Sequence, residues 1–195
     1  MDKTIIQAIG HFLSNYESDL RYISRFQDYK NGYFEPIDYC KKEEGSFYKF
    51  LIEFKVIRSI KKGDSIKLLN GTGRWINGDN PNCVDSFADH LKQIGLTRGS
   101  SKSMVSKIFF LNNPTEIIPM DRLTRESLNL RQNDYAKYQE KLEGFKQNNS
   151  ETISDMMSYV ETFLPSIHKD YREINKLEVI AKNRMIDKLL WTMGS

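Results

Sequence analysis

One carboxylate and one amine in the middle of this 195-residue sequence are the side chains best placed to do chemistry. The carboxylate is Asp121, which follows the apolar segment 117–120 and stands at the start of a predicted helix. A carboxylate at the edge of a buried site can stabilise developing positive charge and orient an attacking water. The amine is Lys102, and a lysine becomes a nucleophile when its surroundings lower its pKa. Asp121 and Lys102 are therefore the two candidate catalytic residues.

Both residues also have ordinary structural interpretations. Aspartate is a common capping residue at the first turn of a helix, so Asp121 could do no more than accept backbone hydrogen bonds. A lone lysine rarely has the lowered pKa that a nucleophile needs, so Lys102 could simply bind phosphate or lie in solvent. Lys107, five residues further along the same predicted helix, is interpreted as a phosphate contact or a solvated charge.

The sequence around Lys102 and Asp121 predicts a helix, a hairpin, a second helix and an apolar segment, in that order. Apolar spacing predicts a helix through Val84, Phe87 and Leu91, which Asn82 can cap and Gly95 closes. A short polar hairpin, 96–101, leads to a second helix that ends near residues 112–114, and the apolar segment then delivers Asp121. Residues 90–115 contain four basic side chains and no Asp or Glu, which predicts a local positive field.

This order resembles the active-site region of the helix-hairpin-helix DNA glycosylases, the superfamily that includes 8-oxoguanine DNA glycosylase. The resemblance runs from residue 87 to about residue 128, within a hairpin and catalytic segment of about 83–130. In that family an apolar-Pro-apolar-Asp segment supplies the catalytic aspartate, and Pro119, Met120 and Asp121 match it. A lysine nucleophile starts the second hairpin helix in members that also cleave the backbone, and Lys102 lies in the similar place.

The resemblance implies an enzyme that flips a modified or damaged base out of DNA and hydrolyses its N-glycosidic bond, with lyase activity left open. Compact bacterial relatives act in antiviral defence by attacking hypermodified bases of phage DNA, which is a second implied role. One departure is that the family hairpin usually has two glycines one residue apart, whereas Gly95 and Gly99 are four positions apart here. No cysteine cluster of the kind that holds an iron–sulfur centre is present, and no cofactor or metal is expected.

The partner implied by the resemblance is DNA, gripped through phosphates by backbone N–H groups and short polar or basic side chains. The candidate DNA-binding residues are Arg98, Gly99, Ser100, Ser101, Lys102, Ser103 and Lys107. A flipped base also needs aromatic faces, for which the candidates are Tyr33, Phe34, Phe47, Tyr48 and Trp75.

The chain as a whole is expected to be one all-α domain, 1–195, because it is 39% hydrophobic and has no alternating run suited to a sheet. Apolar spacing predicts a helix at the N-terminus, a second one through residues 22–26 and a long central helix over 39–60. Turn-forming residues predict a surface loop over 70–81, and the C-terminal third is predicted to be helical, with Pro165 separating two helices. Residues 134–146 are predicted to form a charged, solvated helix.

Two cysteines, Cys40 and Cys83, are too few for a disulfide framework, so we expect a reducing, cytoplasmic location. No membrane span and no obligate protein partner is expected. The three histidines share no metal-ligand spacing, and we interpret His11, His90 and His168 as structural. Trp191 is expected to pack the last helix against the core.

Two other classes of protein remain open. The first is a non-catalytic helix-hairpin-helix module that binds DNA and uses Asp121 only as a cap. The second is a helical interaction protein that binds no nucleic acid. The net charge of +3 permits nucleic-acid binding without demanding it.

Overall fold

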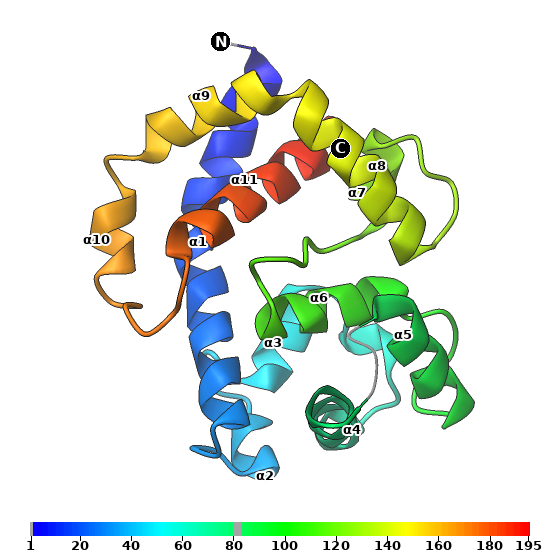
Figure 1. Ribbon diagram of the computed structural model, residues 1–195. Helices are drawn as coiled ribbons and strands as arrows, with labels where there is room; N and C mark the ends of the chain where they lie inside the picture. The colour runs from blue at the N-terminus through cyan, green and yellow to red at the C-terminus, as the bar shows by residue number, and fades with distance from the viewer. Residues whose placement is uncertain (1, 80–82) are drawn as a thin grey trace.

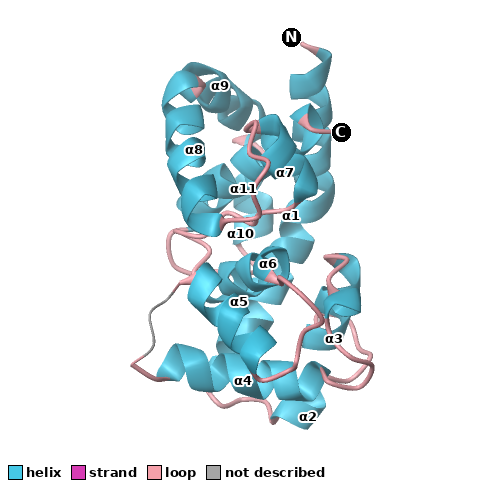
Figure 2. Ribbon diagram, turned by 90° about the vertical axis from the view of Figure 1, so that its right-hand side faces the viewer, coloured by secondary structure: helices cyan, strands magenta, loops and turns pink. Residues whose placement is uncertain are grey.

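The computed structural model describes residues 2–79 and 83–195, and these residues fold into helices and connecting loops (Figures 1 and 2). The prediction of an all-α fold is confirmed for this part of the chain, in which the one β-type contact is an isolated bridge between Ile60 and Thr97. The described helices are α1 (Lys3–Lys30), α2 (Pro36–Tyr39), α3 (Phe47–Glu53), a short 3₁₀-helix (Ile57–Ser59), α4 (Ser65–Asn77), α5 (Val84–Gln93), α6 (Lys102–Asn112), α7 (Arg122–Ser127), α8 (Tyr135–Asn148), α9 (Ser150–Val160), α10 (Leu164–His168) and α11 (Leu177–Met193).

The helices gather at two ends of the molecule, which we call the first lobe (α2–α6) and the second lobe (α7–α11). In Figures 1 and 2, α1 runs along both lobes. It packs most extensively against α11 and also contacts α9, α6 and α3. The segment 113–121 carries the chain from α6 in the first lobe to α7 in the second. The two lobes are therefore joined by one long helix and by the segment that ends at Asp121.

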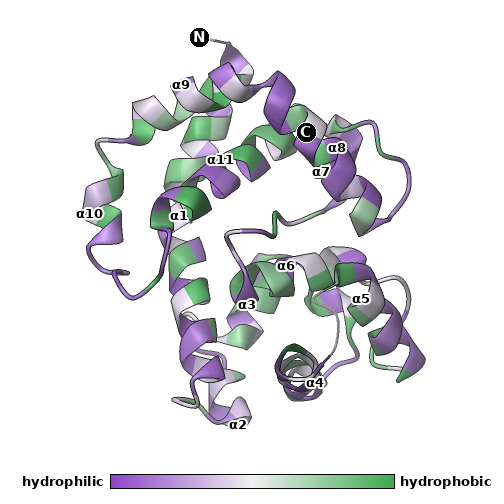
Figure 3. Cartoon of the chain, viewed as in Figure 1, coloured by the Kyte–Doolittle hydropathy of each residue, from purple (hydrophilic) through white to green (hydrophobic). Residues whose placement is uncertain are grey.

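Aromatic rings make up much of the buried core. Most helices carry hydrophobic and hydrophilic residues together, and α6 is buried over much of its length (Figure 3). Phe87 of α5 stacks on Phe109 of α6 with ring centroids 5.5 Å apart, which fixes these two helices against each other. The large side chains that are completely buried include Phe12, Tyr16, Phe26, Phe47, Phe50, Phe87, Phe109, Phe110 and Tyr138.

Two predictions for the N-terminal third are wrong. Residues 3–30 form one helix, not two, and it ends where Gly32 takes a positive φ of 81°. In place of the long central helix predicted over 39–60, the chain has the end of α2 at Tyr39, then α3 and the 3₁₀-helix. Gly45 (φ 74°) and the capping residue Ser46 restart the chain before α3, and Lys55 ends α3 with a φ of 57°. The helical spacing of apolar residues therefore corresponds to an α-helix only over α3 and the residue that follows it, Phe54.

The surface loop predicted for residues 70–81 is also wrong, because residues 65–77 form α4. Leu68, Leu69 and Thr72 are completely buried, and this packing outweighs the low helix propensity of the neighbouring glycines. Gly73 has a specific reason to be there, since a Cβ at this position would lie 2.8 Å from the Tyr29 hydroxyl. Residues 80–82, the end of that predicted loop and the predicted cap Asn82, lie outside the described residues.

The helix predicted over 134–146 is present as α8, but it is not a purely solvated one, because it buries Tyr135, Tyr138 and Leu142. The helices predicted on either side of the 96–101 hairpin are also present. Gly95 closes the end of α5 with a φ of 69°, and α6 ends at Asn112.

In the C-terminal third, α9 buries Ile153, Met156 and Val160, and α11 buries Ile180, Met185, Leu189 and Leu190. Pro165 lies in the first turn of α10, between these two helices. Across the described ranges, every helix is too short or too polar to cross a lipid bilayer.

Candidate functional site

Asp121 stands at the end of an extended segment that is held at three successive carbonyl and amide groups. The Tyr135 hydroxyl donates to the Ile118 carbonyl (3.0 Å), and the Tyr138 hydroxyl donates to the Pro119 carbonyl (3.1 Å). The Met120 N–H donates to the Ser106 Oγ at 3.0 Å. Helices α6 and α8 therefore fix the backbone that leads into Asp121.

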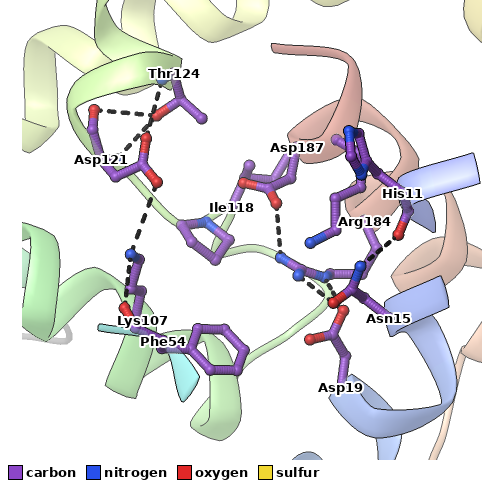
Figure 4. Close-up of polar contacts among 12 residues, drawn as sticks. His11, Asn15, Asp19, Phe54, Lys107, Ile118, Asp121, Thr124, Arg184 and Asp187 are labelled. Carbon is purple, nitrogen blue, oxygen red and sulfur yellow. Dashed lines mark hydrogen bonds and ion pairs between the residues drawn. The ribbon is translucent and has the colours of Figure 1, made fainter. Parts of the chain in front are cut away.

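The carboxylate of Asp121 is divided between two partners. Its Oδ1 accepts a hydrogen bond from the Thr124 N–H (3.1 Å), and the Thr124 hydroxyl accepts one from the Asp121 N–H (2.8 Å), which together form a capping box at α7. Its Oδ2 lies 3.7 Å from the Nζ of Lys107 (Figure 4). The capping interpretation is thus confirmed for one oxygen, while the other faces a buried amine.

Lys107 lies on the largely buried helix α6 and lines the cavity between the lobes. Its Nζ donates to the backbone carbonyl of Phe54 at 3.2 Å, and its side chain is only 14% exposed. Burial lowers the pKa of Lys107, and the nearby carboxylates of Asp121 and Asp187 offset only part of this effect. A lysine in this setting is easier to deprotonate than an exposed one.

Asp121 and Lys107 line a cavity of about 280 Å³, which we call the inter-lobe cavity. Its walls come from α1, the end of α3, α6, the segment before α7, and α11. The lining residues are His11, Asn15, Ser18, Asp19, Glu53, Phe54, Lys55, Lys107, Pro119, Asp121, Arg184, Asp187, Lys188 and Trp191.

A buried ion cluster forms one side of this cavity (Figure 4). The Nε and Nη2 of Arg184 both lie 2.7 Å from the Oδ2 of Asp19, and its Nη1 lies 3.0 Å from the Oδ2 of Asp187. Burial raises the pKa of Asp187 despite the neighbouring Arg184, and burial together with the charge of Arg184 lowers the pKa of Lys188. The cluster ties α1 to α11 and places several charges beside the cavity.

An aromatic edge completes the cavity. The rings of His11 and Trp191 meet edge to face with centroids 5.1 Å apart, and Phe54 lies on the wall that holds Lys107. The sequence interpretation missed His11, Phe54 and Trp191 as site residues, because they come from three distant parts of the chain. It named Lys107 only as a phosphate contact or a solvated charge, although this lysine is a lone charge among the buried residues Val105, Ile108 and Phe109.

Lys102, the predicted nucleophile, lies outside this cavity. Its Nζ is 2.7 Å from the Oδ1 of Asp85 and 3.8 Å from the Oδ2 of Asp134. Desolvation lowers the pKa of Lys102, but the hydrogen bond and charge of Asp85, with Asp134, outweigh it and raise the pKa overall. Asp85 also accepts the backbone N–H groups of Tyr135 and Ala136, both at 3.1 Å, so the cluster anchors α8 to α5 and α6.

The other predicted DNA-binding residues lie at and after the α5–α6 connection. Arg98, Gly99 and Ser100 are exposed, and Ser100 accepts a hydrogen bond from the Asn133 side chain at 3.0 Å. Ser101 is 3% exposed at the start of α6, and its hydroxyl has no hydrogen-bond partner among the described residues. Ser103 is half-buried in the first turn of α6.

The five aromatic side chains proposed for a base pocket are not gathered around Asp121. Phe47 is completely buried in the core, and Tyr33 is 74% exposed. Phe34 stacks on Tyr39, and Trp75 packs against Phe87 and His90. The Lys42 amine lies 5.7 Å from the ring centre of Tyr48. None of the five lines the inter-lobe cavity.

Comparison with known proteins gives no identification. No protein-family model, no curated protein and no solved structure matches the chain. Within the described ranges, no group of three or more His, Cys, Asp or Glu side chains is arranged to hold a metal ion. The inter-lobe cavity presents the carboxylate of Asp121, the amine of Lys107 and the rings of His11, Phe54 and Trp191.

Proposed function

We propose that the protein is a DNA glycosylase that receives a flipped nucleotide in the inter-lobe cavity and hydrolyses its N-glycosidic bond with Asp121. One observation carries this proposal. Asp121 uses one carboxylate oxygen to cap α7 and presents the other beside Lys107 in a cavity of about 280 Å³. A carboxylate held rigidly by its cap and directed toward a partly enclosed space suits the stabilisation of a cationic transition state.

In the proposed reaction, the bond between the sugar C1′ and the base nitrogen breaks, and its electron pair leaves with the base. The negative charge of Asp121 stabilises the positive charge that develops on the sugar. The oxygen of a water molecule then bonds to C1′. One proton of that water passes to the departing base nitrogen, directly or through Asp121, so the products are a free base and a sugar hydroxyl.

The walls of the cavity fit the needs of a flipped base. Such a base is recognised by stacking on aromatic faces and by hydrogen bonds to its edge. His11, Trp191 and Phe54 supply rings, and Asn15 and Lys188 supply polar groups. The resemblance to compact bacterial glycosylases extends the proposal to hypermodified bases of phage DNA, with antiviral defence as the role.

A second candidate function has one observation in its favour. The capping box at α7 already accounts for an aspartate at position 121 without any catalysis. In that case the protein is a DNA-binding module that grips phosphates and releases no base.

Base release from a panel of duplexes separates the two functions. The panel carries damaged bases, uracil and glucosylated hydroxymethyl bases at one salt concentration, and the proteins compared are wild type and Asp121→Asn. The asparagine keeps an oxygen for the Thr124 N–H but loses the negative charge, so the glycosylase proposal requires lost base release with nearly unchanged DNA affinity.

Asp2→Asn is the matched control, because Asp2 caps α1 through the Thr4 N–H and lies outside the cavity. It should leave base release unchanged. Measurable DNA binding without release from any duplex would support the binding module instead.

A further inference from the structure

A second basic segment lies outside the residues that the sequence interpretation assigned to DNA. Residues 54–63 contain Lys55, Arg58, Lys61 and Lys62, and no Asp or Glu. Residues 90–115 have the same charge pattern, with four basic side chains and no acidic one. The two segments are separated in the sequence by α4 and most of α5.

The fold brings the two acid-free segments together. Ile60 and Thr97 form an isolated antiparallel bridge, and both residues are buried, with exposed fractions of 5% and 6%. Ile60 directly follows the 3₁₀-helix, and Thr97 directly precedes Arg98. The bridge therefore fixes the 3₁₀-helix and its flanking cations beside the α5–α6 connection.

The cations brought together in this way are exposed and form no ion pair with another described residue. We call Lys55, Arg58, Lys61, Lys62 and Arg98 the basic ridge. All five are exposed, and no ion pair or side-chain hydrogen bond between described residues engages any of them. The two lysines of α6 differ, because Lys102 contacts Asp85 and Lys107 contacts Asp121.

The basic ridge starts at the inter-lobe cavity. Phe54 and Lys55 line that cavity, and the Phe54 carbonyl accepts the hydrogen bond of Lys107. Lys55 has a positive φ of 57°, the left-handed conformation with which helices commonly end, and it follows α3 directly after Phe54. The ridge thus runs from the cavity wall, through the 3₁₀-helix, to the α5–α6 connection.

We propose that the basic ridge binds the phosphate backbone of the DNA duplex whose target nucleotide enters the inter-lobe cavity. This inference rests on the proposed function, since it identifies the surface through which the same site receives its substrate. Exposed, unpaired cations can neutralise phosphates without first giving up a protein carboxylate, and they require no particular base sequence. Their place beside the cavity positions the duplex for base flipping.

The test is the salt dependence of binding to a fluorescein-labelled undamaged duplex, measured by fluorescence anisotropy with the full chain. The ridge variant is Arg58→Gln, Lys61→Gln and Lys62→Gln, which avoids the cavity residue Lys55. The matched control is Lys3→Gln, Lys141→Gln and Lys169→Gln, which removes the same charge from exposed lysines elsewhere. If each ridge cation contacts one phosphate, the slope of log affinity against log salt falls by about 0.9 per residue.

We expect the ridge variant to lose two to three units of slope and at least about tenfold in affinity at low salt, while the control changes little. A ridge variant whose slope and affinity match those of the control overturns the ridge proposal. Base release from the same proteins is scored separately. If DNA affinity depends on the basic ridge but no duplex releases a base, the ridge proposal holds and the glycosylase proposal is contradicted. If a base is released but DNA affinity does not depend on the ridge, the glycosylase proposal holds and the ridge proposal is contradicted.

Discussion

The amine of Lys107 lies 3.7 Å from the Oδ2 of Asp121 and 3.2 Å from the backbone carbonyl of Phe54. This one side chain therefore bridges the end of α3, helix α6 and the segment that enters α7. Because these elements belong to different lobes, the pairing of the carboxylate and the amine depends on how the lobes pack. Because burial lowers the pKa of Lys107, its amine is more readily neutral, and therefore nucleophilic, than that of an exposed lysine.

If the protein also cleaves abasic DNA, Lys107 is the amine that forms the Schiff base. Borohydride trapping on a duplex with one abasic site should label wild type and Lys102→Gln, and it should fail with Lys107→Gln. The reason is that Lys107 lies in the cavity with a lowered pKa, whereas Lys102 is held by Asp85 with a raised one. Trapping that survives Lys107→Gln but disappears in Lys102→Gln would reverse this assignment.

The pH dependence of trapping gives an independent measurement. A lysine attacks only as the neutral amine, so the yield rises as pH passes upward through its pKa. An ordinary lysine has a pKa of about 10.4. Since burial lowers the pKa of Lys107, the rise should be centred below that value. In a Lys188→Gln variant, which keeps Lys107, the midpoint should stay below the ordinary lysine value. A midpoint at or above that value contradicts a buried nucleophile.

The Asp19–Arg184 pair should dominate the stability of the contact between α1 and α11. Asp19→Ala leaves Arg184 buried with Asp187 as its one carboxylate partner among the described residues, and breaking a buried pair in this way costs about 3–5 kcal/mol in the free energy of unfolding. Urea unfolding followed by circular dichroism measures the change. Asp155→Ala, at an exposed position of α9, is the control and should change the free energy by less than about 0.5 kcal/mol. Equal effects of the two substitutions would contradict the prediction.

The sequence predicts the helices whose pattern is local, such as α5, α6, α9 and α11. Their apolar residues recur at helical spacing, and Gly95 marks the end of α5 by a conformation that glycine favours. It fails for α4, because the burial of Leu68 and Leu69 overrides the turn-forming residues around them. That kind of stabilisation comes from contacts distant in the sequence.

The candidate site was only partly predictable for the same reason. Asp121 could be selected because its motif lies within one short segment. His11, Phe54 and Trp191 could not, since each comes from a different helix or its end and no spacing in the sequence relates them. The aromatic residues chosen from the sequence for the base pocket, among them Phe47, belong to no motif that relates them to Asp121. In the structure they fill the core or lie elsewhere on the surface.

Two helical glycines, Gly10 and Gly73, should respond differently to substitution by alanine. Gly10 of α1 has open space at its Cβ position, so Gly10→Ala should stabilise by about 0.5–1 kcal/mol through helix propensity. Gly73 of α4 should not gain, because its new Cβ would lie 2.8 Å from the Tyr29 hydroxyl, which donates to the Leu69 carbonyl. In a Tyr29→Phe background that hydroxyl is absent, and Gly73→Ala should recover most of the gain. Thermal unfolding of the four variants measures these differences, and a Gly73→Ala effect that is the same in both backgrounds would contradict the close approach of Tyr29 to α4.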